Sequence, residues 1–151
     1  MNPQYILSQI TMDRYARALC RYLNEHKFNF PNDLTVILEQ SDNASSAFEE
    51  ARKNGASVPA ASVEANQVLF QNVGESEYET VWKLLEDNFG DTIDIGNEEW
   101  LSFWTEKILD ECENLFDGCE MLYFGISTAD IDSMSDILIG RIKEYFETYG
   151  L

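Results

Sequence analysis

Few side chains in this chain of 151 residues have the types and spacing that catalysis or metal binding requires. The single histidine, His26, stands beside Lys27 without the further histidines or cysteines that would complete a ligand set. A general base would also need a positioned proton partner. At the end of an expected helix, a histidine interacts favourably with the helix dipole. We therefore expect neither a catalytic nor a metal-binding role for His26.

The three cysteines are the next candidates for chemistry. Cys112 and Cys119 flank a turn expected at Asp117 and Gly118, which would allow a shared metal ion, but structural zinc needs four ligands and the sequence offers no second pair. An odd number of cysteines without a Cys-x-x-Cys motif indicates reduced thiols. The chain also lacks a signal peptide pattern and any apolar run of about 18 residues. We expect free thiols, no metal, no cofactor and a cytoplasmic protein.

One acidic segment has part of a calcium-loop pattern. Asp130 and Asp132 have the spacing of the first two ligands. The pattern then fails, because Met134 occupies a ligand position, Ser135 replaces the required glycine and Arg141 stands where a bidentate glutamate belongs. The sequence favours helix capping for these acids, with a weak cation site as the alternative.

The densest aromatic cluster, at residues 100–104, is the one segment that suggests a binding surface. Trp100 and Trp104 share one face of an expected helix, while Phe103 lies well around the cylinder. Either the helix is buried on several sides, or some of the cluster contacts a partner, since aromatic residues dominate binding hot spots. Trp100, Phe103 and Trp104 are therefore the candidate partner contacts.

Charge is distributed unevenly along the chain. The formal net charge is -18, and residues 75–151 hold twenty Asp and Glu against four Lys and Arg, a balance of -16. Residues 1–30 have a balance of +2. Such a field disfavours contact with nucleic acid or anionic lipid and favours a partner protein, in particular a basic one. The alternative is that the charge only keeps an aromatic-rich protein soluble and monomeric.

Hydrophobic periodicity predicts an all-α fold, with the apolar stripes expected of amphipathic helices. Apolar residues make up 44% of the chain, enough for a core, and no linker or repeat divides the sequence. We expect a compact single domain, 1–151, of about six helices. Their predicted ranges are 12–27, a helix starting after a turn at 31–33 and ending at 55, 57–74, 76–90, 97–116 and 133–150.

Capping residues define most of these limits. Ser57 is expected to cap the third helix, with Pro59 in its first turn and Val63, Leu69 and Phe70 on its apolar side. Ser76 begins a capping box, and Asn97 caps the longest predicted helix.

Three other segments are less regular. The polar residues 41–46 would allow the second helix to break in two. Residues 91–96 are expected to form a loop, and residues 121–126 either a helical turn or an isolated extended piece. The last helix is expected to start near Ser133, three residues before Asp136.

Three stretches carry a resemblance to a known family. They are the pattern Ala-x-x-x-Phe-Glu-x-Ala-Arg-x-x-Gly at 44–55, the segment 68–89 and the ending Tyr-Phe-Glu-Thr-Tyr-Gly-Leu at 145–151. They resemble a family of unknown function comprising small acidic helical proteins of Bacteroides-type bacteria, often encoded beside conjugative transposons. The resemblance implies an all-α fold and a mobile-element setting, and it supplies no catalytic residues.

Three functional hypotheses follow. The leading one is a non-enzymatic interaction module that binds another protein through its acidic second half. A DNA mimic that inhibits a nucleic-acid-binding protein is the alternative, and it would need an elongated regular array of carboxylates. An enzyme with two carboxylates converging in a cleft is the third.

Overall fold

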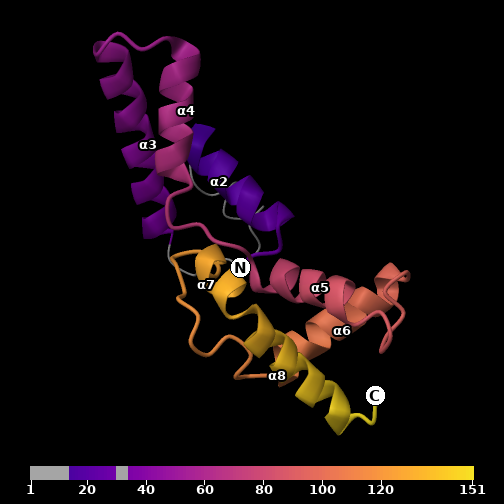
Figure 1. Ribbon diagram of the computed structural model, residues 1–151. Helices are drawn as coiled ribbons and strands as arrows, with labels where there is room; N and C mark the ends of the chain where they lie inside the picture. The colour runs from indigo at the N-terminus through magenta and orange to yellow at the C-terminus, as the bar shows by residue number, and fades with distance from the viewer. Residues whose placement is uncertain (1–13, 30–33) are drawn as a thin grey trace. The chain divides into compact units, whose positions relative to one another are not determined.

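Seven α-helices form the regular secondary structure of residues 14–29 and 34–151, the residues that the computed structural model describes, and no strand is assigned there (Figure 1). This confirms the all-α prediction. Chain contacts divide the protein into two compact units, Met1–Val73 and Gly74–Leu151. The extent of a single domain over 1–151 stays a prediction, and each unit is described separately. The helices are α2 (Arg14–Glu25), α3 (Thr35–Lys53), α4 (Val58–Leu69), α5 (Glu77–Asn88), α6 (Glu98–Glu111), α7 (Thr128–Ser133) and α8 (Ser135–Thr148).

In the first unit, α3 and α4 form a helical hairpin (Figure 1). Gly55 follows α3 with φ +94°, a left-handed conformation that glycine adopts without strain. Ser57 then caps α4, because its Oγ accepts the N–H of Ala60 at 3.2 Å, and a proline lies in the first turn. These local signals confirm the turn predicted between the two helices.

The apolar side of α4 agrees with the prediction at Leu69 but differs from it at Val63. Val63 is 57% exposed, and the buried residues are Ala61, Ala65 and Leu69, which lie four residues apart along one face. Small side chains at the contact allow α3 and α4 to approach closely, and Ala44 of α3 is likewise fully buried. The expectation for Val63 was therefore wrong because helix packing selects alanines over the larger valine.

The amphipathic character of α2 is confirmed. Leu19 and Leu23 are fully buried, and the helix packs against α3. The opposite side is exposed and carries Arg14, Arg17 and Arg21. The predicted start at Met12 and the turn at Pro31 to Asp33 lie outside the described residues.

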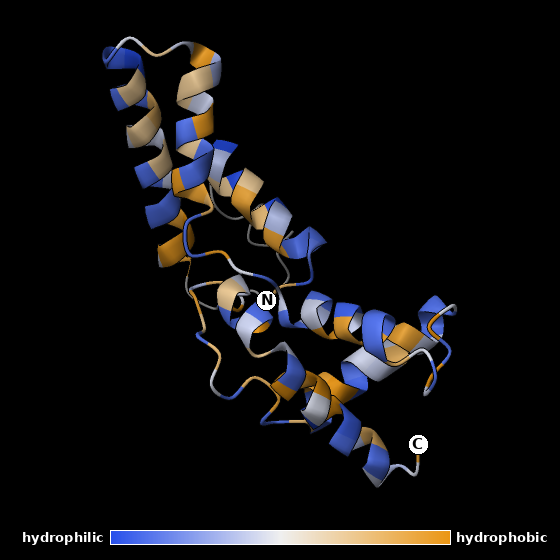
Figure 2. Ribbon diagram, viewed as in Figure 1, coloured by the Kyte–Doolittle hydropathy of each residue, from blue (hydrophilic) through white to orange (hydrophobic). Residues whose placement is uncertain are grey.

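The core of the second unit joins α5, α6 and α8 around Phe146. The Phe146 ring lies 5.3 Å from the ring of Phe89 and 5.2 Å from that of Trp104, measured between centroids. Figure 2 shows hydrophobic and hydrophilic residues alternating along these helices, as amphipathic packing requires. The other buried members of this cluster are Val81, Leu84, Leu85, Ile93, Leu101, Ile108, Leu115, Leu138 and Ile142.

The predicted end of α6 is corrected by a tertiary contact. Helix α6 stops at Glu111 rather than near Phe116, because Cys112 leaves the helix with ψ 76°. The chain then turns and is held by Arg141, whose Nη1 donates to the carbonyls of Leu115 and Asp117 at 2.8 Å each. The longest described helix is consequently α3, with 19 residues and no break at its polar middle.

The irregular segments also differ in part from the prediction. Helix α4 ends at Leu69 and not at Gly74. The last helix is preceded by α7, and Met134 separates α7 from α8 without a side-chain cap. Residues 91–96 form a loop, as predicted. Residues 121–126 adopt the extended alternative, in which Ile126 bridges to both Glu75 and Met121.

Candidate functional site

The most distinctive surface of the second unit is a row of aromatic and charged side chains along α6 and α8. The α6 members stand at spacings of three and four residues, which places them on one side of the helix. Three of the rings are about half exposed: Trp100 (49%), Phe103 (46%) and Tyr149 (45%). We call this surface the aromatic face, and its residues are Trp100, Phe103, Lys107, Glu111, Tyr145 and Tyr149.

The structure separates the three candidate partner contacts into two roles. Trp100 and Phe103 are exposed and meet edge to face, with ring centroids 5.7 Å apart. Phe103 therefore lies beside Trp100, and the expectation that it lies well around the helix from Trp100 was wrong. Trp104 instead packs against the core through Phe146, and its ring lies edge-on to Phe103 at 5.2 Å. Trp104 therefore supports Phe103 from the core side, and of the three only Trp100 and Phe103 present large areas to solvent.

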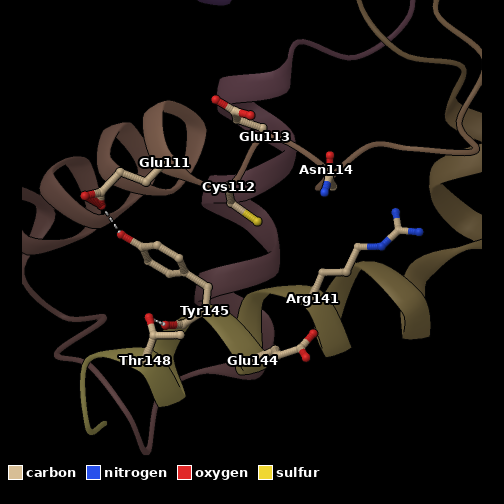
Figure 3. A pocket seen from close by; sticks show the side chains of 8 residues that line it. All are labelled: Glu111, Cys112, Glu113, Asn114, Arg141, Glu144, Tyr145 and Thr148. Atoms are coloured by element: carbon tan, nitrogen blue, oxygen red, sulfur yellow. Dashed lines mark hydrogen bonds between the residues drawn. The ribbon is translucent and has the colours of Figure 1, made fainter.

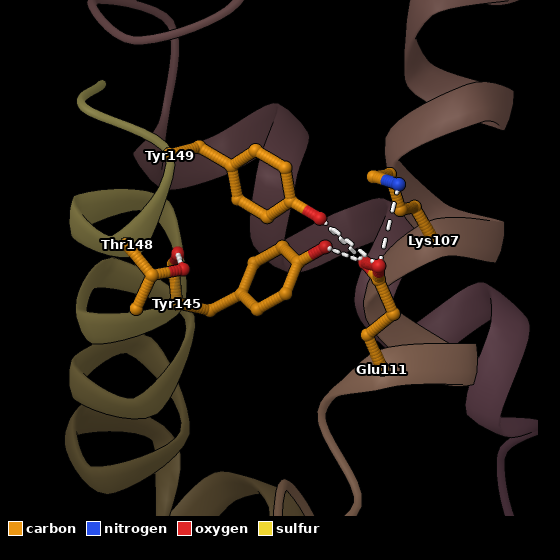
Figure 4. Close-up of polar contacts among 5 residues, drawn as sticks. All are labelled: Lys107, Glu111, Tyr145, Thr148 and Tyr149. Carbon is orange, nitrogen blue, oxygen red and sulfur yellow. Dashed lines mark hydrogen bonds and ion pairs between the residues drawn. The ribbon is translucent and has the colours of Figure 1, made fainter.

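At the other end of the aromatic face, one carboxylate collects three donors. Glu111 accepts hydrogen bonds from the hydroxyls of Tyr145 at 2.5 Å and Tyr149 at 2.8 Å, both from α8 (Figure 4). Lys107 Nζ lies 3.3 Å from the same carboxylate. The two tyrosine hydroxyls, and then the lysine, lower the pKa of Glu111. Burial and the bond to Glu111 raise the pKa of Tyr145.

Only part of this cluster has a sequence signal. Lys107 and Glu111 are four residues apart, a spacing at which helical side chains meet. Tyr145 and Tyr149 share the same spacing on α8. Their convergence on Glu111 depends on how α8 crosses α6, which local spacing does not give.

The lowered pKa of Glu111 predicts a pH-dependent contribution to stability. Because its folded pKa lies below the ordinary value, the contribution is present above that value and is lost as the pH falls through the lowered pKa. In Glu111→Gln we therefore expect a weaker loss of stability in this acid range than in the wild type. Urea midpoints measured at a series of pH values test this.

The matched control for this prediction is Glu113→Gln. The substitution removes the same formal charge as Glu111→Gln. Glu113 is exposed, however, and accepts a hydrogen bond from neither Tyr145 nor Tyr149. Identical pH profiles for the two variants would contradict a specific role of the Glu111 cluster.

A hollow of about 550 Å³ adjoins this cluster (Figure 3). Its charged walls are Glu111, Glu113, Glu144 and Arg141. Arg141 already binds two backbone carbonyls, which makes it a structural residue of the turn after α6. Cys112 also lines the hollow, and burial raises the pKa of its thiol, so the reactive thiolate is disfavoured. The hollow is therefore a polar depression, and the Cys112 thiol in it is not activated as a nucleophile.

The remaining cysteines and the histidine have structural surroundings. Cys119 Sγ lies 3.7 Å from Met134 Sδ, and burial raises the pKa of Cys20 to about 11. The His26 ring packs on Tyr22 with centroids 4.1 Å apart. Within residues 14–29 and 34–151, no group of three or more His, Cys, Asp or Glu is placed to hold a metal ion.

The calcium-like segment has a different role in the structure. Asp130 Oδ2 accepts the backbone N–H of Glu120 at 2.6 Å, which joins α7 to the preceding loop. Asp132 is exposed. Asp130 therefore accepts from a backbone donor outside its own helix. This contact takes the place of the predicted helix capping, since neither α7 nor α8 has a side-chain cap.

A second hollow, of about 490 Å³, lies at the start of α6 beside Phe103. Three glutamates, Glu98, Glu99 and Glu106, line it. Burial raises the pKa of one carboxyl group in the described ranges, that of Glu77, and this residue lines neither hollow.

Fold and surface together define a small all-α protein with a prominent aromatic face. The chain belongs to the family described as "Domain of unknown function (DUF1896)", whose model matches residues 8–151. Its fold is similar to that in the crystal structure of protein PG0816 from Porphyromonas gingivalis, with a TM-score of 0.65, 22% identity and coverage of 89% of this chain and 90% of that chain. No curated protein matches the sequence. In the described part of the chain, none of the helices has the length and apolarity to span a bilayer.

Proposed function

We propose that the protein is a non-enzymatic interaction module that binds another protein through its aromatic face. The observation that carries the proposal is the exposed edge-to-face pair of Trp100 and Phe103. Large aromatic side chains that keep about half their area in solvent gain most from burial against a partner. Such residues are enriched at the centres of protein interfaces.

The surroundings of this pair favour binding because they hold it in place before a partner arrives. Asn97 caps α6 by accepting the N–H groups of Glu99 at 2.9 Å and Trp100 at 3.2 Å. Trp104 fixes the ring of Phe103 from the core side. A preorganised surface loses less conformational entropy on association.

Charge indicates the kind of partner. Residues 75–151 have a balance of -16, so two copies of this surface would repel each other. A partner with a basic surface would be attracted and its encounter accelerated. We therefore propose a basic protein as the partner in preference to a second copy of the chain.

A capture experiment tests the proposal. The tagged chain is incubated with a lysate of its native host at about 50 and 500 mM salt, a range over which screening changes strongly. The same protein is expected to be retained by the wild type at low salt and lost from the double variant Trp100→Ala with Phe103→Ala. The control is Ile137→Ala on α8, which removes an apolar side chain of similar exposure (50%). Equal retention by both variants would contradict the proposal.

The setting of this interaction is also proposed. The resemblance to proteins encoded beside conjugative transposons supports a role in a mobile element. The three free cysteines support the cytoplasm, where thiols stay reduced.

A further inference from the structure

The exposed face of Phe103 borders the hollow at the start of α6, and this part of the aromatic face has a definite chemical character. The hollow has a volume of about 490 Å³. Phe103 supplies its apolar wall, and Ser102 is fixed by a 2.8 Å hydrogen bond between its Oγ and the hydroxyl of Tyr78 on α5. All five lining residues belong to α6, and the bond to Tyr78 anchors this part of α6 to α5.

In the described part of the chain, the three glutamates beside Phe103 are not paired with a cation. Glu98, Glu99 and Glu106 form no ion pair with any residue in the described ranges. The nearby cation, Lys107, is paired with Glu111, whose carboxylate lies 3.3 Å from its Nζ. The same Nζ lies 5.9 Å from the centroid of the Phe103 ring, so a cation already lies over this ring on the side of Glu111. Glu98 and Glu99 stabilise the first turn of α6 through the helix dipole, but Glu106 lies two turns further on, where this effect has faded.

An aromatic ring beside carboxylates fits one side chain better than the others. A guanidinium group is planar, so it can stack on a ring while its edge donates hydrogen bonds to carboxylates. A lysine ammonium is a compact, strongly hydrated charge that lacks this flat surface. The complementarity of charge and shape therefore favours arginine.

We propose that the partner inserts an arginine side chain into this hollow, stacked on Phe103 and bound by Glu106 and its neighbouring glutamates. The proposal rests on the function proposed above and names the chemistry of the partner. Because the hollow opens beside the Trp100–Phe103 pair, one basic segment would cover both.

Short blocked peptides test this without the natural partner. The probes are acetyl-Gly-Arg-Gly-amide, its lysine analogue and its citrulline analogue, which keeps the shape of arginine without the charge. Each is titrated into the full chain to about 20 mM, a range suited to weak binding, and followed by ¹H–¹⁵N NMR. The arginine peptide is expected to give saturable shifts centred on residues 98–106, with binding at least about three times tighter than for the lysine peptide. The citrulline peptide is expected to give none.

Two variants assign the contacts. Phe103→Ala is expected to weaken binding of the arginine peptide by about two- to five-fold through loss of the cation–π contact. Glu106→Gln is expected to weaken it by a similar factor. Glu147→Gln, on the exposed side of α8, removes the same charge and is expected to leave binding unchanged.

The outcomes separate this proposal from the proposed function. Equal binding of arginine and lysine peptides, shifts centred outside residues 98–106, or no saturable shifts at all would each overturn the arginine site. A partner captured in a Trp100- and Phe103-dependent manner would still support the interaction module. Conversely, a bound arginine peptide with no captured partner would leave the site established and remove the support for the module.

Discussion

Replacing Gly74 with alanine is expected to destabilise the second unit by about 3 kcal/mol, at the upper end of overpacking effects. A Cβ atom added at Gly74 would lie 2.0 Å from the carbonyl oxygen of Ile126 and 2.6 Å from its carbonyl carbon. Both are backbone atoms, so no flexible side chain can move aside. The clash would break the hydrogen bonds of this bridge, including the 2.8 Å bond from Gly74 N–H to the carbonyl of Phe124. Urea unfolding followed by tryptophan fluorescence and circular dichroism measures the change.

Gly140→Ala is the matched control for this substitution. Gly140 is exposed in the middle of α8, and an added Cβ meets no atom within 4 Å. Alanine is the better helix former, so this variant is expected to be more stable by about 0.5–1 kcal/mol. Opposite signs for the same chemical change would locate the effect in the close approach at Gly74. A loss below about 0.5 kcal/mol in Gly74→Ala would show that residues 124–126 move away without cost.

Local chemistry explains the elements that the sequence predicted well. Ser57, Ser76 and Asn97 cap α4, α5 and α6 because each hydroxyl or amide oxygen lies within reach of amide groups two or three residues ahead. These signals need no information from distant residues. The buried stripe of α5, including Val81 and Leu85, follows directly from its periodicity for the same reason.

The errors concern positions that only tertiary packing decides. The end of α6 depends on Arg141, which lies 26 residues from Leu115 in the chain. The exposure of Val63 depends on the close α3–α4 contact, where alanine fits better. Sequence periodicity reports that a face is apolar, but the neighbour that covers it determines which residues are buried.

The candidate site, too, could be predicted only in part from the sequence. The aromatic density at 100–104 indicated a surface, but its division into exposed Trp100 and Phe103 and supporting Trp104 required the position of α8. The three glutamates that line the hollow beside Phe103 could not be distinguished by their spacing from the other acidic residues, since residues 75–151 contain twenty Asp and Glu. The DNA-mimic and enzyme hypotheses stay predictions, because neither an extended carboxylate array nor a catalytic pair is tested by these contacts.

Replacing Phe146 with alanine is expected to cost about 3–5 kcal/mol of unfolding free energy, as for other fully buried phenylalanines. The Phe146 side chain is 2% exposed, and its ring contacts Phe89 beside α5 and Trp104 on α6. Its removal takes away apolar contacts with both helices and leaves a cavity between them. Urea unfolding gives the loss, and the fluorescence of the tryptophans reports the environment of Trp104.

This substitution also links the core to the proposed binding surface. Trp104 holds Phe103 from the core side, so losing the ring that backs Trp104 is expected to loosen Phe103 and weaken partner capture. Ile142→Ala removes another fully buried side chain of α8 while leaving the rings of Phe146 and Trp104 in place, and it therefore serves as the control. If Phe146→Ala lowers stability without changing capture at a temperature where the variant is folded, the aromatic face does not depend on support from the core. Rescue of both stability and capture by benzene, which fills apolar cavities, would establish that dependence.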